Sequence, residues 1–398
     1  MRLKHAIVGL AAALGCAFGV AAYAGTGSNS AKPPIHFALV SYAVPGSDSL
    51  TELTAGARGA AKQINARGGF GGRKVVIDAC NSLFSPATST VCAHKLLAKH
   101  PVAEFGCELT WSASGLPIFA KAKIPSVNCP DTAADFNHPW SFGLNTSAIG
   151  QQVGAARYLC SRSDVHTVVS VMPDLPSLKI SQQSSYQVAQ RCGKQTADPV
   201  FYPLTAADVT PYVNKVVQEK PDFVLFSGIG GQAVLFFKTF QQNGIPPSHV
   251  AAPDIDFVYS TTLKQAGGAM DGAYAENQFH TWGDAKNPEV AAYLKAFKGS
   301  SVDPRDPTVA WGYSDVMFFY EAAKKIGFAK FNSASLTKFL RTAKGFHIPM
   351  SRSLFIPGPK GFPQERQPYL QISQWKNGKM SVVRTGPKKD GWVYGYPR

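Results

Sequence analysis

Charged side chains are scarce in this sequence, because Asp, Glu, Lys and Arg together make up 16% of the residues, against about 25% in an average soluble protein. With 36 glycines and 28 prolines in 398 residues, the chain is too rich in helix-breaking residues for a coiled coil or a helical repeat array. Hydrophobic residues make up 45%, so the low charge does not indicate disorder. The length allows two or three domains.

Sequence patterns typical of common enzymes and metal sites are also missing. The chain has no GxSxG, HExxH or Walker A sequence, and its nine histidines are isolated. No two cysteines form a CxxC pair, so we expect neither a zinc site nor another cofactor. The sequence therefore favours a binding protein over an enzyme.

A net charge of +15 raises the question of an anionic partner such as nucleic acid. The densest basic groups are only pairs, at 73–74, 324–325 and 388–389. No aromatic residues alternate with them, as they do in proteins that stack single strands. We therefore expect no nucleic-acid partner.

The first 24 residues have the pattern of a signal peptide. Basic residues at positions 2 and 4 precede an uncharged apolar run over 6–22, and the small residues at its end suit cleavage after Ala24. The run is short and rich in alanine and glycine, which does not favour a membrane anchor. Cleavage before Cys16, followed by lipid attachment, is the second alternative. We expect an exported protein, periplasmic or at the cell surface.

Short strands and helices are predicted to alternate through the first part of the mature chain. The expected strands are 35–42, 75–79, 102–106 and 124–128, and the helices between them are 53–64, 87–99 and 114–121. This order is typical of a parallel sheet with helices on both faces.

The same alternation restarts near residue 167. The expected strands are 167–172, 199–202, 223–227, 249–253 and 273–279, with helices at 177–191, 209–219, 232–243 and 261–266. Three helices without strands between them, at 288–297, 308–326 and 334–343, are expected to return to the first sheet. Two tail strands, 369–375 and 379–383, flank an Asn377-Gly378 hairpin turn. The predicted fold class is α/β, with two doubly wound parallel sheets.

One segment resembles a known family. Residues 55–75 have the sequence AGARGAAKQINARGGFGGRKV, which is similar to the first helix and glycine turn of the leucine/isoleucine/valine-binding protein family. These are type I periplasmic solute-binding proteins of ABC transporters. The resemblance continues at 78–80, 124–125, 222–224 and 313–327, and it covers nearly the whole mature chain.

The resemblance implies two lobes joined by a hinge of three crossings. Lobe I would comprise 33–145 and 280–345, and lobe II would comprise 146–279 and 346–398. It also implies a monomer that captures an amino acid or similar small polar solute between its lobes and delivers it to a membrane permease. A ligand-sensing subunit with the same fold and an exported hydrolase with an unmarked active site are the alternatives.

Candidate binding residues follow from the rule that ligands lie beyond the carboxyl ends of parallel strands. In lobe I, hydroxyl groups that open a helix could hold a carboxylate, and the resemblance assigns this role to Thr110 with the neighbouring Ser112 and to Thr132. Ordinary helix capping is the alternative. Three further lobe I candidates are Ser49, Trp111 and Asp131.

In lobe II the candidates are Gly228, Ile229 and Asp254. Glycine would let the backbone approach the ligand, and Ile229 lies where the family often has an aromatic residue. Asp254 corresponds to the family's ammonium-binding acid, with a solvated loop acid as the alternative. Pro173-Asp174-Leu175-Pro176 replaces a segment common in relatives, so the identity of the solute stays open.

Six cysteines remain after the signal peptide, and an even number in an exported chain indicates disulfides. Chain order favours a Cys160–Cys192 bridge within lobe II. In lobe I it favours two bridges, Cys80–Cys92 and Cys107–Cys129. The resemblance implies a competing pairing, in which Cys80 is linked to Cys107 and Cys92 to Cys129.

Overall fold

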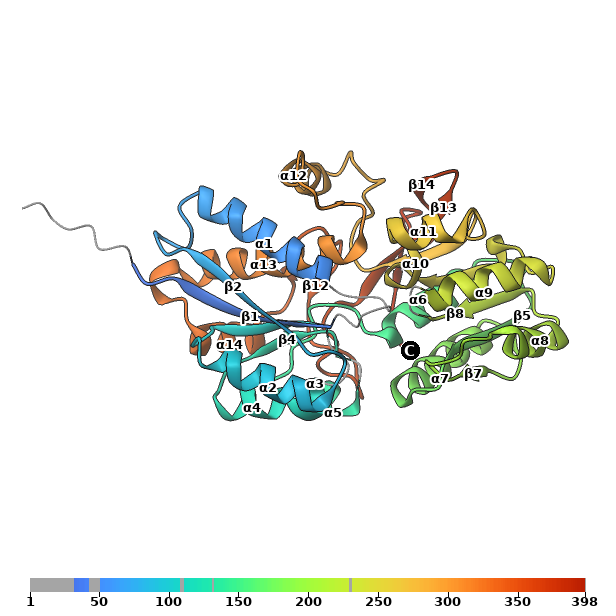
Figure 1. The fold of residues 1–398 in the computed structure, drawn as a ribbon, viewed down its shortest axis with the longest axis horizontal. Coiled ribbons are helices and arrows are strands. Elements are labelled where there is room, and N and C mark those ends of the chain that lie inside the picture. Colours follow the sequence, from blue (N-terminus) through green and yellow to red (C-terminus); the bar gives the residue numbers. More distant parts are fainter. Residues whose placement is uncertain (1–31, 43–50, 108–110, 131, 229–230, 398) are drawn as a thin grey trace, which may run out of the picture.

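The computed structural model describes residues 32–42, 51–107, 111–130, 132–228 and 231–397, which form two lobes side by side (Figure 1). Each lobe is built on its own sheet, and helices cover both faces of each sheet. The predicted class, α/β with two wound sheets, is confirmed. No helix in the described ranges is long and apolar enough to cross a membrane.

Lobe I contains a parallel sheet in the order β2-β1-β3-β4. Its strands are β1 Ile35–Ser41, β2 Val75–Asn81, β3 Ala103–Gly106 and β4 Ser126–Asn128. The helices of this part are α1 Thr51–Ala66, α2 Pro86–Leu97, α3 Trp111–Ser114, α4 Leu116–Lys121 and α5 Ala133–Asn137. Later segments of lobe I are α12 Pro288–Ala296, α13 Pro307–Ile326, the 3₁₀ turn Phe328–Lys330, α14 Ser333–Thr342, and the hairpin strands β11 Phe346–His347 and β12 Leu354–Phe355.

Strand β1 shows why this sheet is covered on both sides. Phe37 and Leu39 belong to the core shared with α1 and α13, whereas Ala38 and Val40 pack with residues of α2 and α4. Successive side chains of a strand point to opposite faces, so a strand with apolar residues on both faces is covered on both sides. The core on the side of Phe37 also includes residues of α12 and α14, so all three later helices pack on the first sheet as predicted.

Lobe II contains a nine-stranded sheet with parallel and antiparallel parts. The parallel strands are β5 Thr167–Pro173, β6 Gln195–Thr196, β7 Val200–Tyr202, β8 Phe223–Phe226, β9 Val250–Pro253 and β10 Tyr274–Asn277. The antiparallel strands are β13 Tyr369–Lys376, β14 Lys379–Val382 and β15 Trp392–Tyr394. Its helices are α6 Ala148–Cys160, α7 Pro176–Arg191, α8 Thr210–Glu219, α9 Gly231–Gln242, the 3₁₀ turn Pro247–His249, α10 Asp254–Phe257 and α11 Ser260–Ala266.

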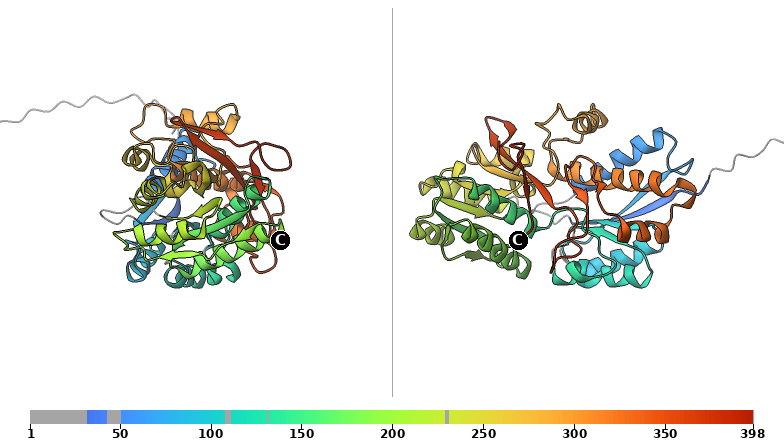
Figure 2. Two further views of the ribbon diagram at one scale, coloured as in Figure 1. Left: turned by 90° about the vertical axis from the view of Figure 1, so that its right-hand side faces the viewer. Right: turned by 180° about the vertical axis from the view of Figure 1, so that it is seen from behind.

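The tail strands extend the sheet of lobe II beyond β10, and they lie on one side of the molecule where the lobes meet (Figure 2). Asn377 and Gly378 both have positive φ, 51° and 72°, which is the conformation that a two-residue hairpin turn of this type requires. The hairpin predicted at these two residues is confirmed by the pairing of β13 with β14.

The lobe boundaries remain a proposal, and the packing suggests one adjustment. Ile348, Met350 and Phe355, in and around the β11–β12 hairpin, belong to the core around the first sheet. We therefore propose that the last crossing into lobe II follows Phe355 instead of residue 345.

Helices α1 and α13 approach each other so closely that glycine is required at the contact. A Cβ atom on Gly56 would lie 2.1 Å from the carbonyl oxygen of Val309, and one on Gly312 would lie 2.0 Å from that of Leu53. In real structures a Cβ atom essentially never comes within 3.0 Å of a heavy atom outside its own residue and its two chain neighbours. Trp311, which lines the cavity described below, directly precedes Gly312 in α13.

Three disulfides join Cys80 to Cys92, Cys107 to Cys129 and Cys160 to Cys192. This is the pairing that chain order favours, and the competing pairing from the resemblance is not present. Each bridge lies within one lobe, so none of them ties the lobes together.

Candidate functional site: the cleft between the lobes

Three segments connect the lobes, namely 143–147, 277–281 and 364–367. They are bonded to one another at their centres. Thr146 N–H donates to Gln278 Oε1 at 3.0 Å, and Ser147 N–H donates to Glu365 Oε1 at 2.8 Å. Backbone bonds also join Gly143 to the third segment. The crossings therefore form one bonded strap.

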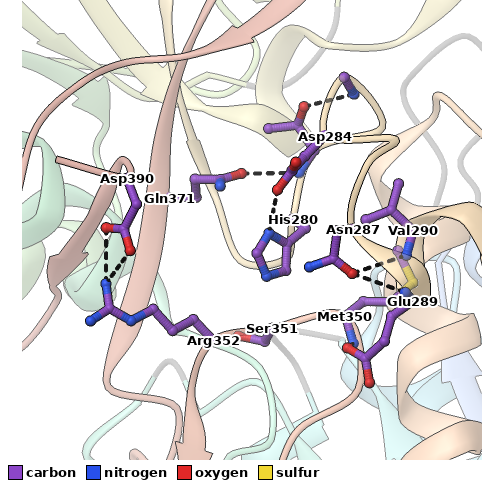
Figure 3. A network of polar contacts seen from close by, with 12 residues as sticks. His280, Asp284, Asn287, Glu289, Val290, Met350, Ser351, Arg352, Gln371 and Asp390 are labelled. Atoms are coloured by element: carbon purple, nitrogen blue, oxygen red, sulfur yellow. Dashed lines mark hydrogen bonds and ion pairs between the residues drawn. The ribbon is translucent and has the colours of Figure 1, made fainter. Parts of the chain in front are cut away.

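A second group of polar contacts lies beside this strap (Figure 3). Arg352, in the lobe I hairpin, forms an ion pair with Asp390 of the lobe II tail, in which Arg352 Nη1 donates to both carboxylate oxygens at 2.7 and 2.9 Å. His280 Nδ1 lies 2.9 Å from Asp284 Oδ2. Both carboxylates are partly exposed, and such pairs contribute little to stability, about 0 to 1 kcal/mol. Of the two, only the Arg352–Asp390 pair joins the lobes, and it aligns them without locking them.

A cavity opens between the lobes at the carboxyl ends of the strands, with about 740 Å³ of unoccupied space, its mouth included. Lobe I contributes Tyr42, Cys107, Cys129 and Trp311 to its wall. The remaining described wall residues are Thr146, Ala148, Gln151, Pro173, Leu175, Ser177, Leu178, Ser227, Pro253, Ile255, Asp256 and Gln278. Many of them end or directly follow a strand, in keeping with the rule used for the sequence.

The lobe I candidates that can be examined lie outside this wall. Ser112 Oγ donates to Asp135 Oδ2 at 2.5 Å, and Thr132 Oγ1 donates to the same oxygen at 2.9 Å. Thr132 and Asp135 form the capping box of α5. Trp111 is buried, and its Nε1–H donates to Ser126 Oγ at 3.2 Å. A ligand role for these three residues stays a prediction that this geometry does not support.

Ser49, Thr110, Asp131 and Ile229 lie outside the described residues, so their predicted roles are not examined. Gly228 is described, and it lies behind the wall. A Cβ atom there would come within 2.4 Å of the Tyr202 hydroxyl. Its N–H donates to Asp256 Oδ2 at 2.9 Å. Gly228 therefore contributes by holding Asp256, which does line the cavity.

Asp254, the predicted ammonium-binding acid, borders a different cavity, whose wall includes His280 and Asp306. Two residues further on, Asp256 reaches the cleft. Both belong to α10, where residues two apart point about 200° from each other. Near this strand end the acid that lines the cleft is thus Asp256, and the ligand role of Asp254 stays a prediction that this geometry does not support.

Burial without a counter-charge shifts several carboxyl groups near the strap. Burial, followed by the nearby Asp256 and Asp306, raises the pKa of Asp254 to about 8. The pKa of Asp306, the N-cap of α13, is raised to about 7 by burial and by Glu52. The pKa of Glu276 is raised well above its usual value by burial. These groups keep their protons at a pH where exposed carboxyls are ionised.

We expect the protein to lose stability as the pH rises from about 4 to 8, and Asp254→Asn to reduce this loss. In that range the unfolded chain releases the Asp254 proton and the folded protein keeps it, so each pH unit costs at most about 1.4 kcal/mol. Melting temperatures at pH 5 and pH 8 measure the effect. Asp198→Asn, which changes an exposed carboxyl, is the control. If the melting temperatures of the parent protein, Asp254→Asn and Asp198→Asn changed equally between pH 5 and pH 8, the raised pKa of Asp254 would be contradicted.

None of the described wall residues was among the ligand residues predicted from the sequence, and Gln151 and Trp311 show why. Gln151 lies in the first turns of α6 and Trp311 in those of α13, and both side chains are almost fully buried. Helical periodicity marks them as core residues, and no local motif distinguishes them. In the described part of the chain, no group of three or more His, Cys, Asp or Glu side chains is arranged to hold a metal ion.

Two sheets of this topology, a three-segment strap and a cavity between the lobes define a two-lobe binding protein. A sequence profile of the periplasmic binding protein family matches residues 39–379, so the chain belongs to that family. No curated protein sequence matches the chain.

Solved structures with the same fold are distant in sequence. A fatty acid ABC transporter substrate-binding protein from Thermomonospora curvata has a TM-score of 0.73 at 15% identity, covering 92% of each chain. A leucine-binding protein from Thermotoga maritima has a TM-score of 0.72 at 15% identity, covering 87% of this chain and 97% of that one. A solute-binding protein from Rhodopseudomonas palustris, in complex with 3,4-dihydroxybenzoic acid, has a TM-score of 0.72 at 14% identity, covering 92% and 98%.

Proposed function

We propose that this chain is the exported solute-binding receptor of an ABC uptake system. It captures a small solute by hinge closure and delivers it to a membrane permease. The observation that carries the proposal is a cavity whose wall comes from both lobes and adjoins the three-segment strap. A ligand that contacts both lobes favours the closed arrangement, because it binds that arrangement more tightly than the open one.

The solute that we propose has an apolar body and a hydrogen-bond donor at one end. Leu175, Leu178 and Ile255 give the wall an apolar part. Asp256 supplies an acceptor for an ammonium or another donor group, as in the amino acid expected from the sequence. The similar structures are named for leucine, fatty acid and an aromatic acid, so the fold itself does not select the solute.

We expect a ligand of this receptor to raise its melting temperature and to make it more compact. A thermal-shift screen of amino acids, amides and aromatic acids identifies the ligand, since a compound that binds only the folded chain stabilises it. Small-angle X-ray scattering with and without that compound then measures the radius of gyration. Binding without compaction would contradict hinge closure, and a screen without any hit would count against the receptor function.

A further inference from the structure

Two hydrogen-bond donors of residues in the cavity wall have no partner among the described residues. The Nε1–H group of Trp311, on lobe I, and the Nε2 amide of Gln151, on lobe II, are buried and unbonded among the described residues. Both side chains are 2% exposed. Buried donors are nearly always paired, because losing water without gaining an acceptor is costly. Neither nitrogen is accessible to a water-sized atom in this arrangement, so the acceptor of a solute would reach both donors only after the two side chains turn toward the cavity.

The described part of the same wall offers a carboxylate no cationic partner. Among its described residues there is no Lys, Arg or His, although the protein as a whole carries a net charge of +15. The internal segments outside the described residues contain no basic residue either. The acidic side chain of the wall, Asp256, would repel a second carboxylate in a setting of low dielectric constant.

Two of the three hydroxyl groups expected to hold a carboxylate already bind one inside the protein, and the third, that of Thr110, lies outside the described residues. Ser112 and Thr132 both donate to Asp135, and the Thr132 N–H also donates to it at 3.1 Å. A ligand carboxylate at this place would compete with Asp135 for the same donors and would lie close to its charge. The protein's own side chain thus occupies that position.

We propose, building on the proposed receptor function, that the cleft selects a small apolar carboxamide and discriminates against the corresponding carboxylic acid. The amide carbonyl accepts from Trp311 and Gln151, and the amide N–H donates to Asp256. A carboxamide matches this set because it is uncharged and has both an acceptor and donors. A carboxylate has acceptors only.

Matched pairs of compounds test the proposal. Calorimetric titration at pH 7 compares leucinamide with leucine, 4-methylpentanamide with 4-methylpentanoate, and benzamide with benzoate. We expect at least one amide to bind, and to bind about tenfold or more tightly than its acid. An acid that binds as tightly as its amide, or failure of all three amides to bind, overturns the proposal. A carboxylate that binds and compacts the protein would still support the receptor function.

Variants identify the donors. Trp311→Phe keeps an aromatic ring but loses the N–H group, and Gln151→Glu keeps the shape but replaces a donor by an acceptor. Each should weaken binding of the amide about fivefold or more. Trp282→Phe is the matched control, because the Trp282 Nε1–H group also lacks a partner but lies outside this wall. Equal losses in the Trp282 and Trp311 variants, or unchanged affinity in Trp311→Phe and Gln151→Glu, overturn the assignment.

Discussion

Gly312→Val is expected to lower the free energy of unfolding by about 3 kcal/mol or more. Its new side chain would start 2.0 Å from the Leu53 carbonyl oxygen and 2.9 Å from the Ala57 nitrogen, so α13 must move away from α1. In a lobe of this size the loss corresponds to a drop in melting temperature of about 10 °C. Thermal unfolding followed by circular dichroism measures it.

Gly231→Ala is the control for this prediction. Gly231 is an exposed residue of α9, and a Cβ atom there would meet no heavy atom within 4 Å. The melting temperature of the Gly231→Ala variant should stay close to that of the parent protein. Equal shifts in the Gly231 and Gly312 variants would show that loss of glycine, and not the α1–α13 contact, is responsible. Because Trp311 precedes Gly312, the valine variant should also bind solute more weakly.

Replacing Cys107 and Cys129 together by serine is expected to reduce both stability and solute affinity. This bridge closes a loop of 22 residues, and opening it costs about 3 kcal/mol in the chain-entropy description. It also lies in the cavity wall, where it joins the ends of β3 and β4. Solute affinity should fall severalfold, as titration calorimetry with a ligand from the screen would measure.

The Cys160–Cys192 bridge provides a matched comparison. It closes 32 residues between the ends of α6 and α7, and neither cysteine belongs to the described cavity wall. The double serine variant should lose about as much stability as the first one but keep its solute affinity. If both variants lost affinity equally, the effect would come from lower stability and not from the wall of the cleft.

The fold could be predicted from the sequence because its strands carry an unambiguous pattern. Strand β1 is apolar on both faces and is followed by an amphipathic helix, and the Asn377-Gly378 pair fixes the tail hairpin. The hairpin of β11 and β12 was missed, since strands of two residues leave no periodicity. Its packing against lobe I is decided by distant contacts that no local pattern records.

The cleft was harder to predict than the fold, and α10 shows why. The sequence locates the strand end before Asp254, but it does not show that a helical turn begins there. That turn directs Asp254 away from the cleft and Asp256 into it. By contrast, the pairing of Thr132 with Asp135 could have been predicted, because a threonine followed three residues later by an acid is a recognised capping pattern.

The disulfide in the cavity wall also links solute capture to the place where the chain matures. A Cys107–Cys129 bond persists only under oxidising conditions, and thiols in the cytosol are kept reduced. A newly made chain that is still in the cytosol would therefore lack the disulfide that joins the ends of β3 and β4 in the cavity wall. By the severalfold loss of affinity expected for the double serine variant, such a chain would bind solute more weakly than the oxidised protein does.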